Sequence, residues 1–252
     1  PSGGPITPSL CEFNPLFVRD QPTLFFSGLG GSQDTWGDEL ILSGLGDRFS
    51  YSLGQLHYQS NGYRDNNDLK NDLYNLFAQV AVTPDFSLQA EYRHRETTSG
   101  DLRSQFDGSF FPSDRRNVNR DTARVGARYS LSPQTDLIAS VIYVDQDSIL
   151  QGLNYKLTKK TAGAQAEAQL LYKAEPFNLI TGLGAYSFDI NLNDLPGIKS
   201  TQQTVYSYGY IKIPDSVIWT VGLSYESDEN ENVNFNKLNP KFGVQWAIND
   251  QV

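Results

Sequence analysis

The feature that most constrains this chain is an alternation of apolar and polar side chains with a period of two residues. In residues 86–93 (FSLQAEYR), every even position is apolar and every odd position is polar. The pattern recurs in residues 123–131, 162–172, 217–225 and 242–248. Successive side chains of a β-strand point to opposite faces, so each stretch predicts a strand with one apolar and one polar face. About twelve such strands are expected between residues 22 and 248.

The connections between these strands predict how they are arranged. Short turns with proline follow alternate strands, at residues 83–85, 132–135, 174–176 and 214–216. The other connections are expected to be long and polar, at residues 96–119, 146–159, 190–201 and 228–238. Outer-membrane barrels have short turns at one rim and long loops at the other, whereas a soluble β-sandwich has no reason to sort its loops by end. The chain is therefore predicted to be all-β, an antiparallel up-and-down transmembrane β-barrel.

The predicted organisation has two parts. Residues 1–21 contain four prolines and no period, which indicates an irregular leader or linker. Residues 22–252 are assigned to the barrel. Because residues 248–252 resemble a further turn instead of an aromatic strand end, the barrel is expected to be truncated or to end unusually.

Composition agrees with a membrane barrel and excludes other classes. Only 38% of the 252 residues are hydrophobic, which is low for a large soluble core, and no run of 18 apolar residues could form a transmembrane helix. The net charge of −9 argues against nucleic acid as a partner. A single cysteine excludes an internal disulfide and a cysteine-based zinc site.

Aromatic side chains are placed where a membrane barrel would use them. Rings with polar tips favour the lipid headgroup level. Several lie near the ends of the apolar faces: Tyr92, Tyr129, Tyr143, Tyr172, Phe177, Tyr225 and Trp246. A soluble sandwich or lipocalin-like barrel stays open as an alternative.

The segment Lys237–Trp246 (KLNPKFGVQW) resembles strands of TonB-dependent-receptor barrels, in which Asn-Pro-Lys often leads into an outward aromatic strand. Residues 69–96, with their Thr-Pro-Asp turn, are similar to hairpins of porins and other Gram-negative outer-membrane barrels, including barrels fused behind tetratricopeptide repeats. No plug domain or TonB box is recognised in the leader. The resemblance implies a bacterial outer-membrane channel or transporter for a small solute or an exported polymer. Its implied partners are outer-membrane lipid, lipopolysaccharide and other envelope proteins.

The candidate functional residues lie on the predicted polar faces and in one long loop. The expected pore-lining residues are Glu91, Arg93, Arg120, Arg124, Arg128 and Glu167. They either bias passage by charge or form ion pairs that fill a narrow barrel. A loop constriction, or a contact with lipopolysaccharide phosphates, is expected at Phe110, Phe111, Arg115 and Arg116. A mobile extracellular loop is the alternative for this segment.

Enzymatic and cofactor functions find little support. His57 and His94 are the only histidines, and neither has a spacing that marks a catalytic nucleophile and its base. The acidic stretches 65–68 and 228–231 lack the spacing of an EF-hand. We therefore expect no catalytic residues, no metal site and no cofactor. The alternative to a channel is a structural or adhesive barrel with a blocked lumen, whose loops bind a partner.

Overall fold

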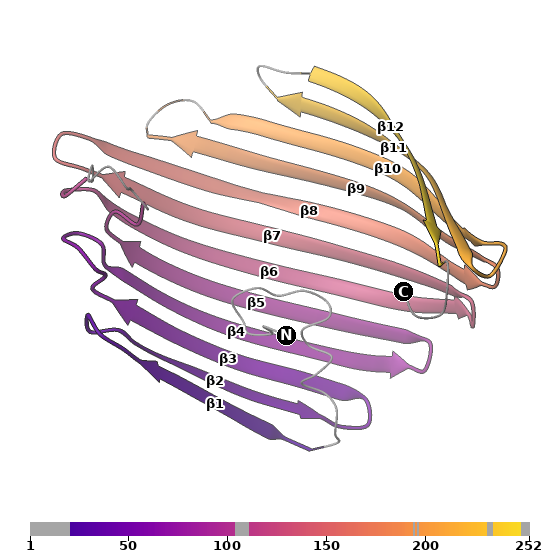
Figure 1. Cartoon of the computed structure of the whole chain (residues 1–252), viewed down its shortest axis with the longest axis horizontal. Coiled ribbons are helices and arrows are strands. Elements are labelled where there is room, and N and C mark those ends of the chain that lie inside the picture. Colours follow the sequence, from indigo (N-terminus) through magenta and orange to yellow (C-terminus); the bar gives the residue numbers. More distant parts are fainter. Residues whose placement is uncertain (1–20, 104–110, 194, 196, 231–233, 248–252) are drawn as a thin grey trace.

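The computed structural model describes residues 21–103, 111–193, 195, 197–230 and 234–247, and these form one twelve-stranded sheet (Figure 1). The strands are β1 (Thr23–Gly30), β2 (Trp36–Leu45), β3 (Phe49–Ser60), β4 (Leu69–Thr83), β5 (Phe86–Ser99), β6 (Arg115–Ser132), β7 (Thr135–Gln151), β8 (Lys156–Ala174), β9 (Phe177–Leu192), β10 (Ile198–Lys212), β11 (Val217–Asn230) and β12 (Asn234–Trp246). Residues 1–20 of the predicted leader lie outside the described residues. The described part of the chain has no helix long and apolar enough to cross a membrane.

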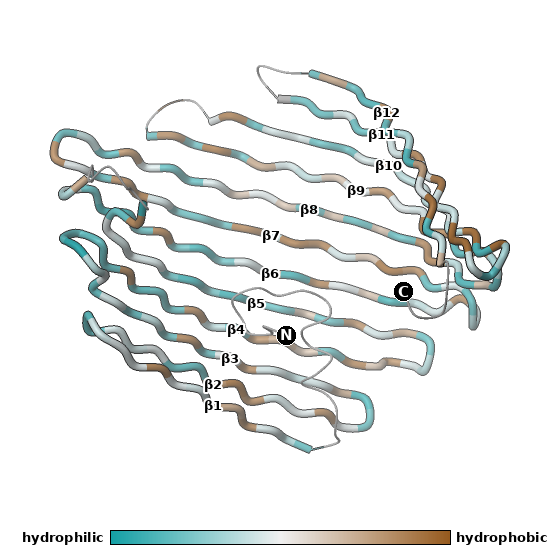
Figure 2. Tube along the Cα trace, viewed as in Figure 1, coloured by the Kyte–Doolittle hydropathy of each residue, from teal (hydrophilic) through white to brown (hydrophobic). Residues whose placement is uncertain are grey.

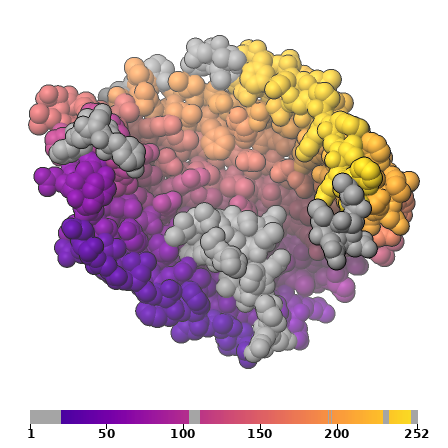
Figure 3. Space-filling model, in the orientation of Figure 1, coloured from indigo at the N-terminus to yellow at the C-terminus, as the bar shows by residue number. Residues whose placement is uncertain are grey.

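Each strand pairs antiparallel with the next strand in the chain, so the order in the sheet is the order in the sequence. This confirms the predicted all-β, antiparallel, up-and-down fold. The sheet curves into a trough, in which β10–β12 turn over towards the remaining strands (Figures 1 and 3). Within the described residues, β1 and β12 do not pair with each other, so the closed barrel is not seen.

The two faces of the sheet differ as the alternation predicts. The outward-facing Leu88, Val125 and Val221 are 37%, 59% and 51% exposed. On the opposite face, the Glu91 side chain, which pairs in register with Arg124, is only 7% exposed. Side chains crowd together on the inner side of a curved sheet and spread apart on the outer side. The apolar face is therefore convex and the polar face concave, and Figure 2 shows the alternation along each strand.

The apolar convex face forms a band of limited height. On β6 it runs from Ala123 to Leu131, and the next outward residue towards the loops is Asp121. On β7 it runs from Leu137 to Tyr143 and is followed by Asp145. A tilted strand crosses a bilayer in about nine to eleven residues. The band spans nine residues on β6, which is enough to cross a hydrocarbon layer, and seven residues on β7.

The strands are longer than predicted, and the expected long loops are wrong in extent. Residues 146–159 were expected to be a loop, but β7 continues to Gln151 and β8 begins at Lys156. The loop expected at 96–119 is confined to residues 100–114, and those expected at 190–201 and 228–238 to residues 193–197 and 231–233. Beyond the apolar band both faces of the strands are polar, so the alternation disappears while the backbone groups still need partners.

A small apolar cluster lies on the concave face of β2–β4, where the pattern predicts polar residues. Leu73 and Phe77 are 1% and 4% exposed, and Leu56 pairs in register with Leu73. Ile41 on β2 is also buried. Burying these side chains stabilises this end of the sheet by about 1.5–3 kcal/mol each.

Candidate functional site

The six predicted pore-lining residues all face the concave side. The register places Glu91 opposite Arg124, and Arg120 opposite Arg95. Arg128 lies opposite Ser87, next to Gln89 on the same face. Glu167 on β8 lies opposite Ser140 on β7. The sequence thus predicts their common face; their role in passage stays a prediction.

Glu91 joins two of the arginines. Its Oε1 accepts a hydrogen bond from Arg93 Nη2 at 2.7 Å, and its Oε2 lies 3.5 Å from Arg124 Nη1. Two guanidinium groups therefore share one carboxylate. The buried Arg124 Nε has no hydrogen-bond partner among the described residues. The arrangement holds the guanidinium in place while it retains a donor.

Arg128 is held by a different carboxylate. Its Nη2 donates to Asp136 Oδ2 at 2.9 Å and its Nε to Asp136 Oδ1 at 3.2 Å. Ser130 Oγ donates to the same Asp136 at 2.7 Å. The Arg128 side chain is 57% exposed, so this pair orients the guanidinium more than it stabilises the fold. Arg120 is exposed as well.

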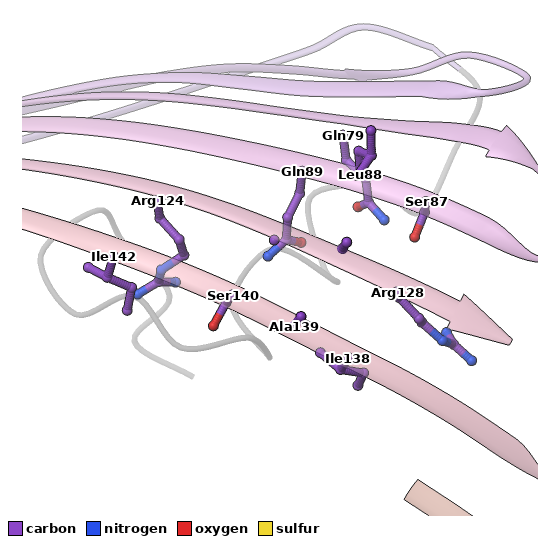
Figure 4. A pocket seen from close by; sticks show the side chains of 12 residues that line it. Gln79, Ser87, Leu88, Gln89, Arg124, Arg128, Ile138, Ala139, Ser140 and Ile142 are labelled. Carbon is purple, nitrogen blue, oxygen red and sulfur yellow. The ribbon is translucent and has the colours of Figure 1, made fainter. Parts of the chain in front are cut away.

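A hollow of about 400 Å³ lies on the concave wall of β4–β7, between Arg124 and Arg128. Figure 4 shows the two arginines on either side of it, with Gln89 and Ser140 between them. Gly126 belongs to its floor, where a Cβ would come within 3.0 Å of the Gln89 amide. Its further lining residues are Gln79, Ser87, Leu88, Ala127, Ile138, Ala139 and Ile142. The donors of this hollow suit a carboxylate, a phosphate or a neutral polar group.

The sixth predicted residue, Glu167, belongs to a separate network. Its Oε1 accepts hydrogen bonds from Tyr206 Oη at 2.5 Å and from Gln169 Nε2 at 2.8 Å. Tyr206 was missed by the sequence analysis, which placed rings on the apolar face. The alternation Tyr206, Tyr208, Tyr210 along β10 was an available signal for aromatic side chains on the concave face.

The predicted loop residues lie among closely connected loops. The Phe111 N–H donates to Asp101 Oδ2 at 2.9 Å, and the Arg103 guanidinium lies 4.1 Å from the Phe111 ring centre. Arg115 Nη1 lies 2.5 Å from Asp68 Oδ1, which ties the start of β6 to the loop before β4. Arg116 is exposed on the concave side. Phe110 lies outside the described residues, so the constriction stays a prediction.

Asp101 and Asn66 organise these loops. Asp101 is 4% exposed, and the N–H groups of Phe111 and Arg103 hold its pKa below the ordinary value of 3.8. The Asn66 amide donates to the carbonyl oxygens of Phe111 and Asp114, both at 2.8 Å, from a left-handed backbone with φ of 54°. Residues 61–68 and the described parts of 100–114 therefore form one connected surface at the loop rim.

Comparison with known proteins places this geometry in a structural class. No protein-family model matches the sequence, and no curated protein matches it. Solved structures do match. The alcaligin outer-membrane receptor FauA of Bordetella pertussis superposes with a TM-score of 0.68 at 16% identity, over 92% of this chain and 42% of its own. The ferric yersiniabactin uptake receptor FyuA of Yersinia pestis superposes with a TM-score of 0.67 at 13% identity, over 92% of this chain and 45% of its own.

FpvA of P. aeruginosa, solved with bound pyoverdines, gives a TM-score of 0.70 at 13% identity, over 90% of this chain and 40% of its own. The fold is that of part of a TonB-dependent receptor barrel. This confirms the resemblance on which the sequence was placed among outer-membrane barrels. The chain spans less than half the length of each of these receptors.

Proposed function

We propose that this chain forms part of the wall of a bacterial outer-membrane barrel through which a small solute or a polymer passes. The observation that carries the proposal is the difference between the two faces of a receptor-like sheet. The convex face presents an apolar band to lipid, and the concave face presents oriented charges to a passage. Binding and passage on such a wall need no covalent chemistry, so we assign no enzymatic activity.

The open sheet edges place a requirement on the membrane assignment. Backbone groups at an unpaired edge have no water to bind within lipid, at a cost of several kcal/mol each. In the membrane, β1 and β12 therefore need partner strands, either each other or further strands of the complete barrel. Lipid and lipopolysaccharide are the proposed partners of the convex face, and other envelope proteins those of the loop rim.

The proposal assigns the charges around the hollow a role in selecting what passes. Arg124 and Arg128 project from one strand into the same space, so both contribute to the potential there. Exchanging them for glutamate reverses two charges on the concave wall. Lys160 lies on the convex face outside the apolar band and is 64% exposed, so Lys160→Glu is a matched control.

The experiment records ion currents of the protein in planar bilayers under a salt gradient. We expect the double variant Arg124→Glu/Arg128→Glu to shift the reversal potential towards cation preference, and Lys160→Glu to leave it unchanged. An unchanged reversal potential in the double variant would contradict the lining role. A folded protein that carries no current would support the second candidate, a structural or adhesive barrel, which the connected loops around Asp101 favour.

A further inference from the structure

Five aromatic side chains form a track along the concave face of β9 and β10. They are Phe188 and Tyr186 on β9, followed by Tyr206, Tyr208 and Tyr210 on β10. The register places Phe188 opposite Ser200 and Tyr186 opposite Gln202, so the five rings span the levels of residues 200 to 210 of β10. At a rise of about 3.3 Å per residue, the track is about 33 Å long.

The rings lie against the wall because glycines stand beside them. A Cβ on Gly182 would collide with the Tyr206 ring, and a Cβ on Gly222 with the Tyr208 ring. A Cβ on Gly163 would collide with the carbonyl oxygen of Ser187 and with the Phe188 ring. The glycines of neighbouring strands thus provide the space in which these rings rest.

Two pairs of neighbouring rings have the same spacing, and the level between the pairs holds Thr204 and Gly184 instead of a ring. The ring centres of Tyr186 and Phe188 are 5.6 Å apart, and so are those of Tyr206 and Tyr208. All five side chains are partly exposed, although buried apolar side chains exist elsewhere on this face. Two equally spaced ring pairs in one accessible row suit a ligand that itself repeats along its length.

Polar groups of both signs accompany the rings. Glu167 and Gln169 lie beside Tyr206 from β8, and Lys241 Nζ lies 5.3 Å from the centre of the Tyr208 ring from β12. The track therefore combines apolar ring faces with donors and acceptors at its sides. Opposite charges beside one another favour a neutral ligand with many hydroxyl groups over a strongly charged one.

We propose that this track binds a linear carbohydrate, with the C–H faces of successive sugar rings on the aromatic rings and their hydroxyl groups on the flanking polar side chains. This deepens the proposed function, because it names the class of polymer that the passage takes. Stacking on each ring contributes about as much as an aromatic pair, so loss of one ring lowers affinity about fivefold.

The test is isothermal titration calorimetry of the protein in detergent, with hexaoses of α-1,4-glucose, β-1,4-glucose, β-1,4-mannose and β-1,4-N-acetylglucosamine, together with their disaccharides. We expect at least one hexaose to bind more tightly than its disaccharide. Tyr208→Ala and Tyr186→Ala should each weaken it about fivefold. Tyr143→Ala, which removes a ring of 48% exposure from the convex face, should leave the affinity unchanged.

Binding of none of these sugars would overturn the proposal, as would binding that Tyr208→Ala and Tyr186→Ala leave unchanged. If 2,3-dihydroxybenzoate binds and none of the sugars does, the track is a site for planar aromatic ligands and the proposal is overturned as well. Heat-modifiable migration on gels confirms that each variant is folded. Calorimetry in detergent measures sugar binding without any passage of solute, and the reversal potential is measured without any sugar. Failure of this proposal and failure of the proposed function are therefore distinguishable.

Discussion

An arginine in the middle of the convex band should destabilise the protein far more than one on the concave face of the same strand. Val141 is 51% exposed and lies between Val125 and Ala166 of the neighbouring strands. The adjacent Ser140 faces the concave side, where it lies opposite Glu167. Val141→Arg and Ser140→Arg therefore introduce the same side chain one residue apart, into lipid and into the passage respectively.

The expected magnitude follows from the position of Val141 in the band. The band on β7 extends from Leu137 to Tyr143, so Val141 lies well inside it. An arginine near the bilayer midplane costs about 2–4 kcal/mol, which is about 30- to 700-fold in the folding equilibrium constant. An arginine at Ala162, level with Asp145 at the border of the band, should cost about 0–1 kcal/mol.

The assay is reversible urea unfolding of the protein in phospholipid vesicles, followed by tryptophan fluorescence. The free energy of unfolding should fall most for Val141→Arg, little for Ala162→Arg, and least for Ser140→Arg, whose new guanidinium meets Glu167. Equal losses at Val141 and Ser140 would refute the assignment of the convex face to lipid.

Three further results are expected. Glu91→Gln should lower the free energy of unfolding by about 3 kcal/mol, because two guanidinium groups lose their shared carboxylate; Arg120→Gln, at an exposed site, should change it by less than about 0.5 kcal/mol in the same urea titration. Asn66→Ala should increase hydrogen exchange in the loops about tenfold, because it removes two hydrogen bonds and strains a left-handed backbone. Asn66→Gly, which removes the hydrogen bonds without the strain, should increase the exchange less. Equal effects of the two variants would contradict this reasoning. The pKa of Asp101 is lower in the folded state than in the unfolded state. The ionised carboxylate therefore stabilises the folded loops fully above pH 3.8, and this stabilisation is lost as the pH falls through the folded-state pKa. Relative to its rate on an unfolded substrate at the same pH, pepsin should therefore cut residues 100–114 more readily at pH 2 than at pH 4 in the wild type, and Asp101→Asn should abolish this difference.

The faces of the sheet could be predicted from the sequence because lipid and water impose opposite demands on alternate residues. Leu88 and Val125 lie on the convex face and Glu91 and Arg124 on the concave face, as the alternation indicates. The strand ends could not be predicted in this way. At the start of β8, residues 156–161 (KLTKKT) are almost entirely polar, and such a stretch looks the same in a water-exposed strand and in a loop.

Other features depend on contacts between distant segments. Asn66 binds the carbonyl oxygens of Phe111 and Asp114 only because the fold brings two loops together, and no local pattern encodes this. The concave tyrosines were missed for another reason. Aromatic rings with polar tips were expected at the lipid interface, whereas Tyr206 and Tyr208 lie against the inner wall in the space that neighbouring glycines leave.

The most direct test of the account is the accessibility of successive residues along β7. After Cys11→Ser removes the native thiol, single cysteines at residues 137 to 145 are spin-labelled in the vesicle-bound protein. Electron paramagnetic resonance then compares collisions with oxygen, which concentrates in lipid, and with a water-soluble nickel chelate. The account predicts oxygen maxima at positions 137, 139, 141 and 143 and nickel maxima at the even positions between them. Accessibility without a period of two, or with the two probes in phase, would contradict it.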